Sequence, residues 1–132
     1  MAQTFAIRGV HHLRLTVTDL PRSRAFYMSV FGFEVAAEMP PVGDPAYDAV
    51  NAVLFGGVML SKGSLLLGLR PVAPPGDRFD ENRVGLDHLS FSVADRAEIE
   101  QAARTLDERG IPHGAITDLP SSNTCILAFR DP

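Results

Sequence analysis

The chain of 132 residues is poor in cysteine, in basic charge and in long apolar runs. Its one cysteine, Cys125, excludes an internal disulfide and a thiolate cage for zinc. A net charge of −4 argues against nucleic-acid binding, because that function needs a basic surface. The apolar runs are too short to cross a bilayer, and residues 1–8 lack the features of a signal peptide. These absences predict a cytoplasmic protein that binds neither nucleic acid nor membrane.

Two stretches of the chain repeat each other at an offset of 76 positions: residues 10–19, VHHLRLTVTD, and residues 86–95, LDHLSFSVAD. Each alternates apolar and polar residues, which predicts a strand, and each ends on an aspartate that can open a helix. His12 in the first copy aligns with His88 in the second. Folding the two copies against each other can therefore bring two imidazoles together.

The first copy opens a module, residues 8–70, in which one helix begins at Asp19 and ends at Gly32. Its predicted strands cover residues 10–17, 33–37, 52–59 and 64–69. Residues 71–84, rich in proline and mixed charge, predict a linker.

The second module, residues 85–132, opens with a strand over residues 86–93. A helix follows, with capping-box spacing from Asp95 to Glu98, and Gly110 ends it. Further strands are predicted at 111–116 and 124–129. The counterpart of the last strand of the first module falls beyond Pro132, so we expect one strand of the second module to be missing from this sequence. Either the native protein continues, or the sheet has an open edge.

These stretches resemble the vicinal-oxygen-chelate superfamily, which includes glyoxalase I, extradiol dioxygenases, fosfomycin-resistance transferases and bleomycin-resistance proteins. The resemblance covers nearly the whole chain as one domain. It implies an α+β fold in which paired βαβββ modules curl into a half-barrel around one divalent metal. The matching pieces are VHHLRLTVTDLPRSRAFYMSVFGFEV, GSLLLGLRP, GLDHLSFSVAD and CILAFRDP.

The resemblance also implies metal ligands at His12 and His88. Gly68 stands where a glyoxalase-like chain has a ligating glutamate, so the four-ligand pattern of glyoxalase I is broken. The second-module carboxylate of the family would lie beyond Pro132. Two imidazoles and one carboxylate leave open positions on the metal and suit Fe(II) or another first-row ion such as Mn, Ni or Zn. That set is closer to the dioxygenases and the fosfomycin transferases.

Candidate substrate-binding residues flank these histidines. Arg14 follows His12 by two positions, on the same predicted strand face, and a buried arginine needs an acidic partner or an anionic ligand. Arg70 is a second candidate for an anion, with surface exposure an equal expectation. Ser90 and Ser92 share the predicted face of His88 and can orient a substrate or a water.

Two classes of function follow. The first is a metal-dependent lyase or isomerase, transferase or dioxygenase, acting on a small oxygenated substrate that chelates the metal through two oxygens. Arg14 favours an anionic substrate. No residue stands out as its general base. The second is a metal-free protein that sequesters a small molecule, as bleomycin-resistance relatives do. Gly68 favours the second class and the matched histidines favour the first. For either class we expect a homodimer.

Overall fold

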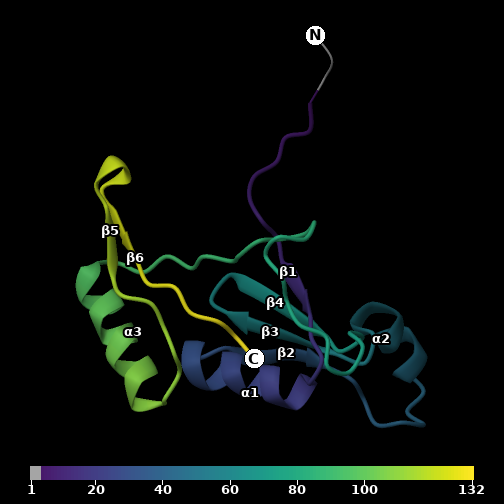
Figure 1. Cartoon of the computed structure of the whole chain (residues 1–132). Helices are drawn as coiled ribbons and strands as arrows, with labels where there is room; N and C mark the ends of the chain where they lie inside the picture. Colours follow the sequence, from purple (N-terminus) through teal and green to yellow (C-terminus); the bar gives the residue numbers. More distant parts are fainter. Residues whose placement is uncertain (1–3) are drawn as a thin grey trace. The chain divides into compact units, whose positions relative to one another are not determined.

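A computed structural model describes residues 4–132, and these residues form two compact units that divide between Asp77 and Arg78 (Figure 1). Each unit combines helices with strands, so the predicted α+β class is confirmed. The finer division into two modules and a linker stays a prediction. In the structure, residues 71–94 contain turns and bends and no helix or strand.

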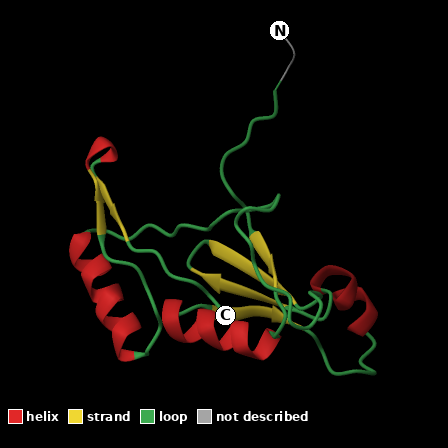
Figure 2. Ribbon diagram, viewed as in Figure 1, coloured by secondary structure: helices red, strands yellow, loops and turns green. Residues whose placement is uncertain are grey.

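The first unit contains a four-stranded sheet, whose strands are yellow in Figure 2, and the strand order is β1-β4-β3-β2 (Figure 1). Strand β1 runs parallel to β4, whereas the β2–β3 and β3–β4 pairs are antiparallel. This is the predicted βαβββ connectivity with one additional helix. In chain order the elements are β1 (Leu13–Thr16), α1 (Leu20–Phe31), β2 (Glu34–Glu38), α2 (Tyr47–Leu54), β3 (Val58–Lys62) and β4 (Leu65–Arg70).

Helix α1 begins and ends where the local sequence predicts. The side chain of Asp19 accepts a hydrogen bond from the Arg22 amide at 3.0 Å, and Pro21 lies in the first turn, where its missing N–H costs nothing. Gly32 ends the helix in the left-handed conformation, at φ 71°, which costs glycine little.

The two faces of the sheet differ in composition. Alternation along β3 and β4 places Leu60, Leu67 and Leu69 on one face, and each of them is at most 2% exposed. Helix α1 lies against the sheet and contacts β4 (Figure 1). It contributes the buried ring of Tyr27. Burying each such side chain stabilises the fold by roughly 1.5–3 kcal/mol. The opposite face is free of these core leucines and carries the residues discussed below.

The predicted strand at residues 52–59 is wrong in its first half, because residues 52–54 form the end of α2 and β3 begins only at Val58. A short apolar run fits a helix face as well as a buried strand. Here Asp48 favours the helix by lying in its first turn, and Leu54 buries the apolar side. Phe55 and Gly56 then end α2 with positive φ angles of 53° and 76°.

The second unit contains α3 (Arg96–Glu108), β5 (Thr117–Leu119), a 3₁₀ turn (Pro120–Ser122) and β6 (Thr124–Ile126). Strands β5 and β6 pair antiparallel, and α3 contacts β6. The start of α3 confirms the prediction, since the Glu98 amide donates to the Asp95 carboxylate at 3.0 Å. The Glu98 carboxylate in turn accepts from the Ala94 amide at 2.7 Å.

The predicted strand over residues 86–93 is wrong, because no regular strand forms there. In the first copy, β1 exists through its hydrogen-bonded ladder with β4. Within the described residues, no strand pairs with residues 86–93 as β4 pairs with β1. The strand predicted at 111–116 is wrong, because within it only His113 forms an isolated bridge, with Phe129, and β5 begins after it at Thr117. The strand predicted at 124–129 is shortened to β6 and that bridge.

Candidate functional site

Arg14 and Arg70 lie together on the face of the first sheet that is opposite the leucine core. The β1–β4 register pairs Arg14 with Gly68 and Thr16 with Arg70. A Cβ atom added to Gly68 would lie 3.1 Å from Nε and 3.2 Å from Cγ of Arg14. The side chain of Arg14 therefore runs across the position that a side chain at residue 68 would need.

Phe55 supplies an aromatic surface for both arginines. The guanidinium carbon of Arg70 lies 3.7 Å from the centroid of the Phe55 ring, and that of Arg14 lies 5.7 Å from it. Both distances are within cation–π range. A positive φ at a bulky residue costs about 1 kcal/mol or more, so the surrounding fold must hold Phe55 in place. We call Arg14, Phe55, Gly68 and Arg70 the arginine cluster.

The positive charge of the arginine cluster is not neutralised by the residues that the structure describes. Neither Arg14 nor Arg70 forms an ion pair within residues 4–132. The Nε atom of Arg70 is buried and has no hydrogen-bond partner within the same range. A buried donor without an acceptor costs roughly 1–3 kcal/mol. An oxyanion would supply both the missing acceptor and the missing negative charge.

His12 and His88 show the same local arrangement in the two units. His12 lies immediately before β1, is exposed, and has its Nδ1 2.9 Å from Nδ1 of His11. His88 is exposed, and its Nδ1 lies 2.6 Å from Oδ1 of Asp87. In both cases the partner is the preceding residue, and His11 and Asp87 are themselves equivalent in the repeat. Each ring therefore has Nε2 as the nitrogen through which it can bind a metal.

The predicted site residues divide between the units. Arg14 and Arg70 come together in the first unit, where His12 precedes Arg14 by two residues. The other three, His88, Ser90 and Ser92, belong to the exposed irregular segment of the second unit. Within residues 4–132 no three His, Cys, Asp or Glu side chains are grouped as a metal site. The metal-ligand and substrate roles of these residues stay predictions.

Phe55 is the member of the cluster that the sequence analysis missed, because residues 52–59 read as a continuous strand. One signal was available: two glycines follow it, Gly56 and Gly57, and paired glycines mark a turn. A turn before β3 would have separated Phe55 from the strand and directed its ring independently of the strand alternation.

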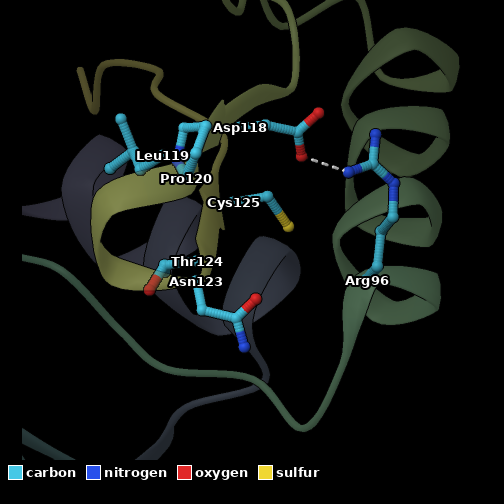
Figure 3. Close-up of a pocket in the computed structure, with 7 residues that line it drawn as sticks. All are labelled: Arg96, Asp118, Leu119, Pro120, Asn123, Thr124 and Cys125. Atoms are coloured by element: carbon cyan, nitrogen blue, oxygen red, sulfur yellow. Dashed lines mark hydrogen bonds and ion pairs between the residues drawn. The ribbon is translucent and has the colours of Figure 1, made fainter.

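A pocket of about 350 Å³ lies in the second unit, and none of the predicted site residues lines it (Figure 3). Arg96 donates a hydrogen bond across it to Asp118, and this interaction raises the pKa of the Arg96 guanidinium. The half-buried thiol of Cys125 is part of its wall. The lining residues are Arg96, Asp118, Leu119, Pro120, Asn123, Thr124 and Cys125.

Comparison with known proteins gives a family match over almost the whole chain. Residues 9–132 match the family model described as the Glyoxalase/Bleomycin resistance protein/Dioxygenase superfamily. The uncharacterized protein YwkD of Bacillus subtilis (strain 168) is 26% identical over 126 residues, covering 96% of this chain and 91% of YwkD. The uncharacterized protein YaeR of Escherichia coli (strain K12) is 28% identical over 127 residues, covering 96% of this chain and 90% of YaeR.

Solved structures show the same fold. A glyoxylase/bleomycin resistance protein/dioxygenase domain from Frankia sp. EAN1pec matches with a TM-score of 0.73 and 27% identity, over 96% of this chain and 85% of that one. A mutant of the fosfomycin resistance protein FosX from Listeria monocytogenes, complexed with Mn(II) and 1S,2S-dihydroxypropylphosphonic acid, matches with a TM-score of 0.67. Its identity is 18%, over 95% of this chain and 85% of that one, which bears on the fold alone.

Proposed function

The chain belongs to the Glyoxalase/Bleomycin resistance protein/Dioxygenase superfamily, and from this premise we propose that it is a metal-dependent enzyme acting on a small oxygenated anion. His12 and His88 are the proposed metal ligands. The proposed substrate carries two neighbouring oxygens that chelate the metal, and a negatively charged group. The reaction belongs to the lyase or isomerase, transferase or dioxygenase kinds that we predicted from the resemblance.

The observation that carries this proposal is the matched setting of the two histidines. In each unit Nδ1 is engaged by the side chain of the preceding residue, at 2.9 Å for His12 and 2.6 Å for His88. Metal-binding histidines characteristically use one ring nitrogen for such a bond and the other for the metal. Packing does not account for this arrangement, because both histidine side chains are exposed.

The donor chemistry fits a divalent first-row ion, since imidazole binds Fe, Mn, Ni and Zn. Gly68 contributes no ligand, and the Arg14 guanidinium lies across it. A divalent ion held by His12 and His88 would act as a Lewis acid on a substrate oxygen. The residues of the chain then have separate roles: Arg14 and Arg70 hold the negative group of the substrate, and Ser90 and Ser92 orient it.

Metal analysis of the full chain tests the proposal. Protein is stripped with EDTA, loaded separately with Fe(II), Mn(II), Ni(II) or Zn(II), desalted, and analysed by mass spectrometry of the metal. We expect stoichiometric loading with at least one of these ions. Loading should be lost in His12→Ala, His88→Ala and the double variant, and retained in His113→Gln, which removes a histidine outside the proposed site. Equal loading of the double variant and the wild type would overturn the proposal.

A second candidate function is metal-free binding of a small anion. It is favoured by the side chain of Arg14, which runs across Gly68 and leaves no room for a ligating carboxylate there without moving. Under this candidate the chain binds its ligand equally well in EDTA. Added metal changes neither the affinity for that ligand nor which ligand is bound. Calorimetric titration with and without metal separates the two functions.

We also propose that the protein is a homodimer, which sedimentation equilibrium tests, and that it acts in the cytoplasm. Within residues 4–132 there is no helix both long and apolar enough to span a membrane.

A further inference from the structure

The arginine cluster holds its two cations in place before any ligand arrives. The carbonyl of Arg70 accepts hydrogen bonds from the Val17 amide at 2.9 Å and from the Val72 amide at 3.0 Å, which fixes its backbone between β1 and the chain that follows β4. Its guanidinium lies 3.7 Å from the Phe55 centroid. Stacking on this ring restricts the side chain and lowers the entropy cost of binding a ligand.

Residue 68 is a glycine, and the absence of a side chain there leaves room for the guanidinium of Arg14, the second cation of the cluster. A Cβ there would lie 3.1–3.3 Å from atoms of Arg14 and Met59, which is closer than ordinary contact. A glycine at the position paired with Arg14 in the β1–β4 register leaves the space that the Arg14 side chain crosses to reach the Phe55 ring. Compared with the glutamate that a glyoxalase-like chain has at this position, Gly68 contributes no carboxylate and leaves room for the guanidinium of Arg14. The local charge is therefore positive here and negative in such a chain.

We propose that Arg14 and Arg70, gathered over the Phe55 ring beside Gly68, form a binding site for the oxyanion of a small ligand, a carboxylate or phosphate group, that works without a bound metal. This deepens the proposed function and rests on it for one point, that the site is the substrate site. The anion site itself lies wholly within the first unit. It explains why Arg70 has a buried Nε with no acceptor within residues 4–132.

Packing alone accounts poorly for the same observations. Arginine that serves only to cover an aromatic ring is satisfied when its N–H groups reach water or a carboxylate. Here one N–H is shielded from water, and a second guanidinium shares the same ring in a chain whose net charge is −4. Two like charges brought together repel each other, and an anion between them removes that repulsion.

Nuclear magnetic resonance of the arginine side chains tests the proposal directly. The full chain, labelled with ¹⁵N and kept in EDTA, is titrated with inorganic phosphate and, separately, with acetate, against sodium chloride at equal ionic strength. We expect the Nε–H signals of Arg14 and Arg70 to shift in a saturable way with at least one of the two anions and not with chloride. The phosphate and acetate arms decide which oxyanion the site prefers. Arg14→Gln and Arg70→Gln assign the two signals.

Matched variants separate charge from shape. Gly68→Glu places a carboxylate beside Arg14 and should weaken anion binding by about tenfold or more, whereas Gly68→Gln, of the same size and neutral, should weaken it less. Arg14→Gln should also weaken binding, and Arg22→Gln, on the exposed side of α1, should not. Circular dichroism verifies that each variant is folded. A wild-type chain without a saturable shift, or a Gly68→Glu or Arg14→Gln variant that binds as tightly as the wild type, would overturn the proposal.

The experiments distinguish a failure of this inference from a failure of the proposed function. If metal loading depends on His12 and His88 but no anion binds in EDTA, the proposed metal-dependent enzyme stands, whereas this inference and the metal-free candidate are wrong. If anion binding depends on Arg14 and Arg70 but no metal is retained, the oxyanion site stands and the metal-dependent enzyme falls.

Discussion

Replacing Gly57 by alanine tests how closely the end of α2 approaches β4. A Cβ atom at Gly57 would lie 1.9 Å from the carbonyl oxygen of Leu69 and 2.9 Å from that of Leu54. The first distance is more than 1 Å shorter than Cβ contacts seen in proteins, and both obstacles are backbone atoms. The Leu69 side chain is 1% exposed, so β4 cannot move without disturbing the core. Overpacking of this kind costs about 3 kcal/mol or more.

Urea denaturation followed by circular dichroism measures the effect. With a slope of about 1–3 kcal/mol per M, a loss of about 3 kcal/mol lowers the midpoint by roughly 1–3 M. Gly68→Ala is the matched control, because its Cβ would meet only the movable side chains of Arg14 and Met59, at 3.1–3.3 Å. We expect that variant to stay within about 1 kcal/mol of the wild type. Gly57→Ala with a midpoint equal to that of Gly68→Ala would refute the reasoning.

Three further predictions concern the core, a helix cap and a titrating histidine. Leu60 is fully buried, so Leu60→Ala should lower the free energy of unfolding by about 2–5 kcal/mol in the same urea assay. Asp95→Ala removes the cap of α3 and should cost about 0.5–2 kcal/mol, whereas Asp95→Asn should cost less; helicity and the urea midpoint report both. His113 hydrogen-bonds two acceptors, the Gly114 carbonyl at 2.6 Å and the Asp107 carboxylate at 3.1 Å, and these bonds raise its pKa. The protonated ring is thus favoured in the folded chain, and its stabilising contribution is complete below about pH 6.5 and lost as pH rises through the raised value. The melting temperature of the wild type should therefore fall over this range more than that of His113→Gln, and parallel pH profiles would contradict the assignment.

The local sequence determined where α1 and α3 begin and where α1 ends. Asp19 and Asp95 accept hydrogen bonds from amides three residues on, and Gly32 adopts a left-handed conformation. These interactions involve neighbours in the chain, so they can be predicted without knowing the fold. The repeat, the broken ligand pattern at Gly68 and the α+β class are equally properties of residue order. The same order suggested an anion near Arg14.

Tertiary structure decided which distant residues meet. The segment over residues 86–93 has the alternation of a strand, but a strand forms only when another backbone accepts its hydrogen bonds. In the part of the chain that the structure describes, no backbone does this for it as β4 does for β1. Phe55 joined the cluster because α2 ends there with positive φ, a choice that the apolar run did not reveal. Arg14 lies across Gly68 because the parallel β1–β4 register makes them neighbours, and the charge of the site follows from that pairing.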